Sequence, residues 1–581
     1  MEEWGIFYLK ISIFSFMPAK FKKLPYGKSN FADVIEGGFA YVDKTRFIEM
    51  LENENNPTQF FVRPRRFGKS LFLSVLENYY DLNRKDKFES IFDNLCIGKN
   101  PTQEQGKYAI LSFNFSAINT DCEETFKESF KMNVHASVVN FLKKYEDKFE
   151  NAQQEINWIK EKTLGIDSLR VVYHLAEYSN IPIFAIIDEY DHFSNDLAAM
   201  GSEFYGKMVG KAGLVRDFYE SLKIATSSVM KRIFITGIAP IMLNDLTSGF
   251  NIATDYSLIP KYNEMFGFTS EEVERLIIET GIDKNLIKVD MEAYYNGYLF
   301  NEEAEKKVYN STMVLFLFNQ ILLRGKQPND IIDTNLQTDY NRLKKLAENP
   351  KNREKLLKIA HEDGIFSKII EKFSLDQIED DSYFVSLLFY MGLLTIDKER
   401  PLYLKIPNYS IKTLFWQYLV AQANSLVSDS VNADKLLETV RELARGDAVP
   451  YLDYISENLF KRISNRDLIH FDEKYIKVML LSTLFMSSFY LPVSETEVAA
   501  GYTDIYLLRH SGFAIKAEFE WVWELKYVKE SATEAEIEAK KQEALSQIEK
   551  YKKDLRFAGR NDIKFAALVF RGKGDYEVVG C

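Results

Sequence analysis

The chain has 581 residues, of which 46% are hydrophobic and 27% charged, and this length predicts several folded domains rather than one core. The net charge of −12 argues against a protein that coats nucleic acid through its overall charge, although a local basic groove is compatible with it. The 3 cysteines are widely spaced and predict neither a disulfide framework nor a metal-binding cluster, which fits the reducing cytoplasm.

Residues 1–17 are interpreted as an N-terminal extension. The stretch 6–16 is apolar, but it is too short to span a bilayer and it follows Glu2 and Glu3 without a basic region. Met17 is an alternative start, and a membrane anchor is the weaker alternative for this stretch. Elsewhere the sequence has no apolar run long enough to span, so we expect no membrane partner.

A phosphate-binding loop is predicted after a short buried strand at 59–62. A loop at 63–67 leads into Gly68, Lys69 and Ser70, which open a helix. In this context backbone N–H groups and the helix N-terminus hold phosphate oxygens, Lys69 reaches the β- and γ-phosphates, and the Ser70 hydroxyl ligates Mg²⁺. The alternative is a helix start that binds no nucleotide.

The loop is unusually basic. Arg63 stands at the position where the usual loop has its first glycine, and Arg65 and Arg66 follow. We expect these three side chains to contact phosphates or an adjacent acidic chain.

Polar residues follow two further predicted strands. The continuous apolar run 181–187 is typical of a central parallel strand, and it ends in Asp188 and Glu189. Asp188 is expected to hold Mg²⁺ through water, and Glu189 to act as the general base for the attacking water. Thr236 ends the strand 232–237, where it either senses the γ-phosphate or is a plain strand-end hydroxyl. With a strand at 109–115, these segments predict an α/β sheet whose site lies at the carboxyl ends of its strands.

The ordered motifs in the first half resemble a bacterial family of AAA-ATPase-like proteins. They are Tyr-Val-Asp-Lys-Thr at 41–45, Phe-Val-Arg-Pro-Arg-Arg-Phe-Gly-Lys-Ser at 61–70, Ile-Ile-Asp-Glu-Tyr-Asp at 186–191, Ile-Thr-Gly-Ile-Ala-Pro at 235–240 and Tyr-Tyr-Asn-Gly-Tyr at 294–298. Arginine at the first-glycine position is the usual form in that family. The resemblance implies ATP binding at residues 18–260, a P-loop domain, followed by a helical lid at 261–330.

The middle of the chain, residues 331–448, is predicted to be a mainly helical spacer. Segments 341–346 and 368–373 are amphipathic, and 383–395 with a strand at 402–406 could form a winged-helix-like element. The aromatic turn at 294–300 before it is interpreted as a packed turn, with part of a lid as the alternative. Thr269 and Ser270 followed by two glutamates predict a helix start.

Residues 449–581 are predicted to form an α/β domain. An apolar helix at 474–489 precedes a strand at 501–508 that contains Asp504, and a second strand at 519–526 contains Glu524 and Lys526. Strand alternation puts Glu524 and Lys526 on one face of that strand. A helix around 544–551 and a strand at 563–570 complete the expected elements.

The order of an Asp and then Glu-x-Lys on the next strand resembles the PD-(D/E)xK nuclease superfamily, whose fold is restriction-endonuclease-like. The resemblance implies that Asp504 and Glu524 ligate Mg²⁺ or Mn²⁺ beside a scissile phosphate, while Lys526 positions the water or neutralises the phosphorane. It also makes Glu473 an accessory acid and matches Gln547, with Tyr551, to a downstream helix motif. Thr503 departs from relatives that often carry Arg, which puts phosphate binding in doubt. The alternative is a cross-strand ion pair without catalysis.

The leading hypothesis is an ATP-binding, ATP-hydrolysing cytoplasmic protein with a metal-dependent DNA nuclease domain. The second is a non-catalytic switch in which ATP gates a surface that binds nucleic acid, a protein partner or a second copy of the chain. The third is a scaffold that binds neither ligand.

Overall fold

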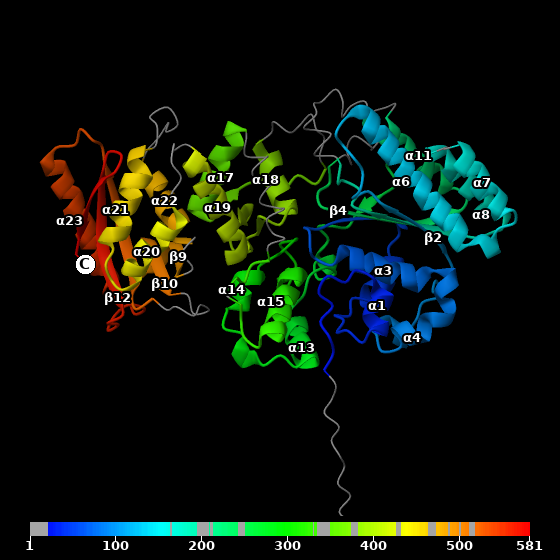
Figure 1. Ribbon diagram of the computed structural model, residues 1–581, viewed down its shortest axis with the longest axis horizontal. Coiled ribbons are helices and arrows are strands. Elements are labelled where there is room, and N and C mark those ends of the chain that lie inside the picture. Colours follow the sequence, from blue (N-terminus) through cyan, green and yellow to red (C-terminus); the bar gives the residue numbers. More distant parts are fainter. Residues whose placement is uncertain are drawn as a thin grey trace, which may run out of the picture.

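The structure is a computed structural model that describes residues 21–162, 165–193, 208–209, 213–241, 250–328, 330–333, 349–372, 381–425, 432–462, 472–485, 489–498, 501–509 and 517–580. The chain forms an elongated molecule, with the N-terminal sheet at one end, the C-terminal sheet at the other and mainly helical elements between them (Figure 1). The expected extension at 1–17 and the segment 341–346 lie outside the described residues.

The N-terminal sheet is fully parallel, with the strand order β2-β3-β4-β1-β5. Its strands are β1 (Thr58–Val62), β2 (Ala109–Asn114), β3 (Ile183–Asp188), β4 (Met230–Gly237) and β5 (Thr254–Asp255). All residues of β1 and β3 are buried, as expected for central strands covered on both faces. The parallel sheet predicted from the sequence is therefore confirmed.

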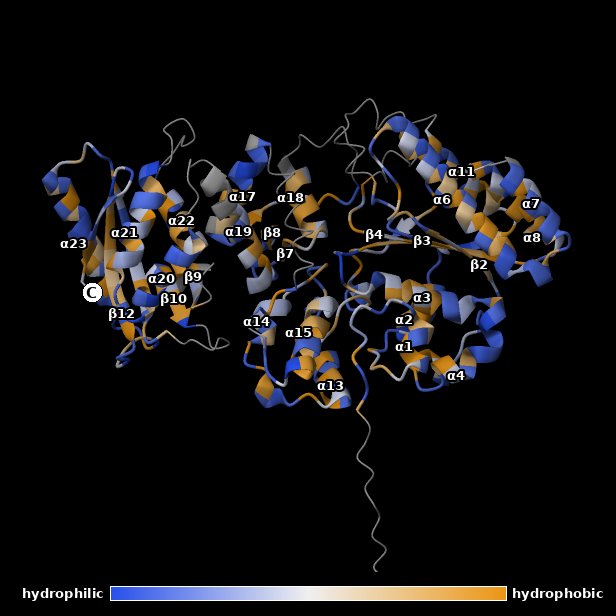
Figure 2. Ribbon diagram, in the orientation of Figure 1, coloured by the Kyte–Doolittle hydropathy of each residue, from blue (hydrophilic) through white to orange (hydrophobic). Residues whose placement is uncertain are grey.

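Helices cover both faces of this sheet (Figure 1). One group lies on the side of the phosphate loop: α1 (Phe31–Glu36), α2 (Arg46–Glu52), α3 (Lys69–Tyr80), α4 (Phe88–Phe92) and α5 (Cys96–Lys99). The other group is α6 (Glu123–Lys144), α7 (Ala152–Lys162), α8 (Ser168–Tyr178) and α11 (Leu214–Ala225). Figure 2 shows hydrophobic strands between helices whose outer faces are hydrophilic.

The expected lid region contains α13 (Ser270–Thr280), α14 (Met291–Tyr295) and α15 (Ser311–Arg324). Thr269 caps α13 through a reciprocal pair of hydrogen bonds with Glu272, so the predicted helix start is confirmed. The turn after α14 is tightly packed, since a Cβ on Gly297 would lie 2.1 Å from the Pro407 carbonyl oxygen. The interpretation of this aromatic segment as a packed turn is confirmed.

The middle region combines helices with a small antiparallel sheet of order β6-β8-β7. Its elements are α17 (Pro350–Glu362), β6 (Gly364–Phe366), α18 (Asp381–Tyr390), β7 (Thr395–Ile396), β8 (Tyr403–Lys405) and α19 (Tyr409–Ser425). The strand expected near 402–406 is present as β8. Residues 368–372, expected to continue the helical pattern, are not helical, and Ile370 N instead donates to the Ser386 hydroxyl.

The C-terminal domain is a mixed sheet of order β13-β12-β11-β10-β9. After α20 (Ala433–Ala444), its elements are α21 (Val449–Asn458), α22 (Glu473–Phe485), β9 (Tyr490–Val498), β10 (Gly501–Arg509), β11 (Glu520–Val528), α23 (Glu534–Tyr551), β12 (Ile563–Arg571) and β13 (Asp575–Val579). Because β11 and β12 are parallel, α23 is the crossover between them. The multidomain α/β fold class is confirmed, while the edge strands β9 and β13 were not predicted.

The middle region packs against both ends of the molecule. Helix α19 packs on α22 of the C-terminal domain, and α17 also contacts α22. On the other side, a Cβ on Gly392 would lie 2.8 Å from the Pro64 ring in the phosphate loop. None of the helices in the described ranges is long and apolar enough to cross a membrane.

Candidate functional site

The strand order brings the phosphate loop next to the two other polar strand ends. Strand β4 lies between β1 and β3, so Thr236 sits between the loop that follows β1 and Asp188 at the end of β3. Asp188 accepts hydrogen bonds from the Ser70 hydroxyl at 2.7 Å, the Thr236 hydroxyl at 2.8 Å and Glu189 N at 2.9 Å. Three segments far apart in sequence therefore meet at one buried carboxylate.

Lys69 is buried within the predicted phosphate-binding loop. Its Nζ donates to the carbonyl oxygens of Arg63 at 2.8 Å and Pro64 at 2.9 Å. Burial lowers the pKa of Lys69 to about 8, against the opposing effect of Asp188 and neighbouring acids. An anionic ligand on the loop would raise the pKa of Lys69 again, because it favours the charged form.

Arg63 occupies a different place from the one expected. Its guanidinium is 1% exposed, donates to the carbonyl oxygens of Val62, Ser257 and Tyr262, and lies 4.2 Å from the centroid of the Phe300 ring. Burial lowers its pKa to about 9. Arg63 thus supports the base of the loop from the interior and is not directed to where a phosphate would lie.

The shape of the rest of the loop is set by its backbone angles and by hydrogen bonds from α15. Arg66 and Gly68 have positive φ angles of 69° and 90°, and Gly68 precedes the first turn of α3. The Arg66 carbonyl oxygen accepts hydrogen bonds from the hydroxyls of Ser311 at 2.9 Å and Thr312 at 3.2 Å, which open α15. Arg65 Nε is buried without a hydrogen-bond partner among the described residues, which leaves a donor beside the loop.

Glu189 has a strained backbone and a partner that the sequence did not reveal. Its φ is 52°, a value that non-glycine residues adopt rarely. His192 Nδ1 lies 3.0 Å from Glu189 Oε2. The contact with His192, together with the charges of Arg65 and Lys69, holds the pKa of Glu189 below its usual value.

The residues that end the motif at 186–191 bond to the residues that follow the Thr-Gly pair at 236–237. These contacts hold two strand ends together rather than form a ligand site. Asp191 accepts hydrogen bonds from Ile238 N and Ala239 N, and the Tyr190 hydroxyl donates toward the carbonyl oxygens of Ala239 and Ile241. A Cβ on Gly237 would lie 2.4 Å from the Tyr190 ring. This packing fixes the end of β4 beside the end of β3, which holds Thr236 on Asp188.

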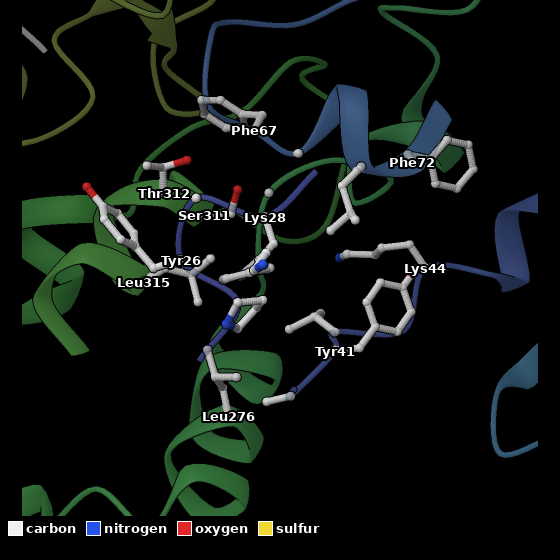
Figure 3. Close-up of a pocket in the computed structure, with 18 of the residues that line it drawn as sticks. Tyr26, Lys28, Tyr41, Lys44, Phe67, Phe72, Leu276, Ser311, Thr312 and Leu315 are labelled. Carbon is white, nitrogen blue, oxygen red and sulfur yellow. The ribbon is translucent and has the colours of Figure 1, made fainter. Parts of the chain in front are cut away.

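A cavity of about 320 Å³ opens beside Gly68 and was not predicted from the sequence (Figure 3). Its wall is mainly apolar and comes from five segments of the chain, with Tyr41, Leu276 and Leu315 among the side chains that line it, while the Tyr26 hydroxyl points away and donates to Asp333. A flat apolar ring system fits this lining. The only signal in the sequence was the Tyr-Val-Asp-Lys-Thr motif, which contributes Tyr41 and Lys44.

Lys44 joins the N-terminal segment to the lid. Its Nζ donates to both carboxylate oxygens of Glu272, at 2.8 and 2.7 Å, and to the Glu264 carbonyl oxygen at 2.8 Å. Glu272 is also the capping residue of α13. A buried ion pair therefore joins the cavity wall to α13.

The oxygen atoms at the first site suit a magnesium ion. Ser70 and Asp188 offer a hydroxyl and a carboxylate 2.7 Å apart, and Mg²⁺ is usually bound by one or two such groups together with substrate phosphates and water. Within the described ranges, no group of three or more His, Cys, Asp or Glu side chains is arranged as a metal site. The fit thus depends on phosphate oxygens that a nucleotide would supply.

The C-terminal domain gathers the residues predicted for its site. Lys526 Nζ donates to Glu524 Oε1 at 2.6 Å, and Leu525 N donates to Asp504 Oδ2 at 2.7 Å, which turns Asp504 toward the next strand. Glu524 and Lys526 lie on one face of β11, as the alternation predicted. Burial and the nearby Asp504 charge raise the pKa of Glu524 to about 7.

Residues from two helices complete this site. Tyr551, at the end of α23, lies within hydrogen-bond distance of Glu524 Oε2 (2.8 Å), while Gln547 Oε1 one turn earlier is buried without a hydrogen-bond partner in the described structure. On α22, burial and then Asp504 raise the pKa of Glu473. Lys477, one turn after Glu473, was not predicted; its Nζ lies 3.9 Å from Asp504 Oδ1 and the residue is 3% exposed.

Two observations bear on phosphate and metal binding there. Thr503 is fully buried and its hydroxyl has no hydrogen-bond partner among the described residues, so it supplies no charge for a phosphate. Asp504 and Glu524 supply hard carboxylate oxygens, and a pair of carboxylates is a sufficient protein contribution when water and substrate phosphate complete the shell. The donor set therefore fits Mg²⁺ or Mn²⁺.

Comparisons with known proteins find a family match in each half of the chain. Residues 25–247 match the family described as "Predicted AAA-ATPase", and residues 471–577 match the PD-(D/E)XK nuclease superfamily. An uncharacterized protein from the vnfD 5′ region of Azotobacter chroococcum is 26% identical over 313 residues, which are 52% of this chain and 52% of that protein. The chain thus spans about half the length of this curated relative.

Among solved structures, the Walker-type ATPase of Pyrococcus abyssi aligns with 64% of this chain and 94% of its own, at 14% identity and a TM-score of 0.35. The chain therefore contains a predicted AAA-ATPase domain at residues 25–247 and a PD-(D/E)XK nuclease superfamily domain at residues 471–577.

Proposed function

We propose that the protein binds and hydrolyses ATP with Mg²⁺ in its N-terminal half and cleaves DNA with its C-terminal domain. The observation that carries the proposal is the convergence of the Ser70 and Thr236 hydroxyls on Asp188, next to the buried Lys69 and an apolar cavity. The proposed division of the chain is a P-loop domain at 18–260, a lid at 261–330, a linking region at 331–448 and a nuclease-like domain at 449–581. A cytoplasmic location belongs to the same proposal.

In the proposed ATPase site, the base and ribose occupy the cavity lined by Tyr26 and Tyr41, and the phosphates lie on the loop from Arg65 to Ser70. Lys69 leaves its two carbonyl partners to contact the β- and γ-phosphates. Ser70 and Asp188 would hold Mg²⁺, which neutralises charge on the phosphate oxygens. Thr236 keeps Asp188 in place, and Glu189 accepts a proton from the attacking water once it is released from His192.

In the proposed nuclease site, Asp504 and Glu524 would hold Mg²⁺ or Mn²⁺, which activates water and stabilises charge on the phosphate. Lys526 stays beside Glu524 and faces the developing negative charge. Tyr551 holds the second oxygen of Glu524, so that the carboxylate keeps its orientation. Glu473 and Gln547 act as accessory groups at the rim.

One observation favours a second candidate function. Both oxygens of Glu524 already have protein partners, Lys526 and Tyr551. A closed network of this kind is also what a domain would have if it retained the fold only to bind nucleic acid or a protein partner. In that case ATP would order the lid and gate the binding surface without cleavage.

The test is to assay purified protein for ATP hydrolysis and for Mg²⁺-dependent DNA cleavage, with Lys69→Ala and Glu524→Ala as separate variants. We expect Lys69→Ala to lose hydrolysis and Glu524→Ala to lose cleavage while retaining hydrolysis. ATP binding without cleavage of any DNA would support the switch. Unchanged activities in both variants would refute both site assignments.

A further inference from the structure

A basic groove in the linking region is separate from both sites. It has a volume of about 570 Å³ and lies between α17 on one side and the end of β6 with the start of α18 on the other. Lys351, Lys355 and Lys358 line the α17 wall, and among the described residues that line the groove Glu354 is the only acid. In a chain with a net charge of −12, this is a local excess of positive charge.

The lysines lie on one face because of helical spacing. Positions 351, 355 and 358 are separated by four and three residues, so their side chains follow one stripe along α17. The other side of α17, with Leu356 and Ala360, is fully buried in the core. Lys351 and Lys358 are exposed and Lys355 is half-buried, with its ammonium 5.9 Å from the Phe384 ring centroid.

The other wall is aromatic and apolar. Phe366 is 68% exposed at the end of β6, an edge strand, and its ring meets that of Tyr403 edge-on at 4.8 Å. Ile365 and Val385 form an apolar part of the lining. Lysines opposite an exposed ring are the combination by which single-stranded nucleic acid is held, since phosphates pair with the cations and bases stack on the ring.

We propose that this groove binds single-stranded nucleic acid and delivers it to the C-terminal domain. The inference rests on the proposed nuclease function, because it names the form of the substrate. A single strand fits better than a duplex because only unpaired bases can place a π-face on Phe366 and the apolar lining. The location supports it, since α17 packs directly against α22, the helix that carries Glu473 and Lys477.

The winged-helix-like arrangement does not supply this surface through its second helix. Residues 383–390 of α18 are all buried and contain no Lys or Arg, so α18 cannot enter a groove of DNA. The basic surface belongs to α17 instead. The proposed binding of a single strand by α17 is therefore distinct from the reading of a duplex by the second helix of a winged helix.

The experiment measures binding by full-length protein that carries Glu524→Gln, without divalent ions, so that cleavage does not interfere. The probe is a fluorescein-labelled oligothymidylate longer than the site of about 4 to 16 nucleotides typical of single-strand binders, with a duplex of equal length as comparison. Anisotropy is recorded between about 50 and 200 mM salt. The groove variants are Lys351→Glu/Lys358→Glu and Phe366→Ala, and the charge-matched control is Lys143→Glu/Lys160→Glu on α6 and α7, where both lysines are exposed.

We expect the lysine variant to lower the slope of log affinity against log salt by about 1.4, at about 0.7 per phosphate contact. We expect Phe366→Ala to weaken single-strand binding about tenfold without changing that slope. The control should bind as the parent does. Equal or tighter duplex binding that is indifferent to Phe366, unchanged binding in both groove variants, or no binding of nucleic acid by the parent would each overturn the proposal. DNA cleavage by wild-type protein, measured separately, would still stand in those cases.

Discussion

The Ser70 hydroxyl donates a 2.7 Å hydrogen bond to Asp188 Oδ2, although 118 residues separate the two in the chain. This contact joins the helix that follows the phosphate loop to the end of a different strand. It is the relationship on which a Mg²⁺-nucleotide site depends, because the Ser70 hydroxyl and the Asp188 carboxylate would together hold the ion.

Lys69→Met is expected to reduce ATP hydrolysis by at least about 100-fold, since removal of one preorganised charge donor has effects of that order. The same variant should lose the rise in melting temperature that ATP and Mg²⁺ give the wild type. Lys143→Met, at an exposed position of α6, is the matched control and should behave as wild type. Equal hydrolysis by Lys69→Met and its control would rule out the loop as the phosphate site.

Thr236→Val is expected to lower kcat about tenfold, because it removes the hydroxyl that holds Asp188 Oδ1 at 2.8 Å while keeping the side-chain volume. Thr236→Ser keeps the hydroxyl and should retain most of the activity. Steady-state kinetics of the two variants decide the point. If Val and Ser are equivalent, Thr236 is a plain strand-end residue.

Glu189→Gln is expected to bind ATP but to lower hydrolysis by about 10² to 10⁴-fold, the usual range for loss of a general base. Radiolabelled ATP retained on the protein would report binding, and single-turnover hydrolysis would report chemistry. His192→Ala serves as the comparison, because it removes the partner 3.0 Å from Glu189 without removing the carboxylate. A Glu189→Gln variant that hydrolyses ATP normally would exclude this residue as the base.

Asp255 should make the stability of the N-terminal half depend on pH. Burial raises its pKa from 3.8 to about 6, so the folded state holds a proton that the unfolded state has lost between these values. Stability relative to Asp255→Asn is therefore highest at low pH and falls as pH rises toward about 6, above which the difference is constant. We expect Asp255→Asn to gain roughly 2 to 6 °C in melting temperature on the wild type between pH 5 and 7.5. A difference in melting temperature that stays flat over this range would contradict the shift.

Tyr551→Phe is expected to reduce DNA cleavage about tenfold, because Glu524 Oε2 loses its partner at 2.8 Å while the ring still fills its place. A melting temperature close to that of the wild type would show that the change acts on the site. Tyr527→Phe, on β11 but outside the contacts of Glu524, is the control. Full cleavage by Tyr551→Phe would mean that the orientation of Glu524 is set by Lys526 alone.

The sequence was sufficient for features that follow from local pattern. The apolar run before Asp188 fixed a buried strand and placed its carboxylate at the strand end, and alternation along β11 placed Glu524 beside Lys526. Arg63 was misjudged because its partners are carbonyl oxygens of Ser257 and Tyr262, nearly 200 residues away, and no local pattern encodes them.

The cavity beside Gly68 escaped prediction for a similar reason. It is assembled from the segment 25–28, the motif at 41–44, α3 and the lid, and each contribution is an ordinary apolar side chain. Lys477 was hidden within an apolar helix whose pattern indicated only burial. Such residues become informative only when their neighbours in space are known.

The close packing of Gly392 on Pro64 means that the middle region also supports the phosphate loop. With Gly267 N bonded to the Phe67 carbonyl oxygen and Thr312 bonded to that of Arg66, the loop is gripped by the segments that flank it in space as well as by its own strand and helix. A fragment ending near residue 330 would leave Pro64 and Phe300 facing water. We therefore expect the N-terminal half to lose stability when it is excised, so truncation experiments would report on the loss of this support rather than on the autonomy of either half.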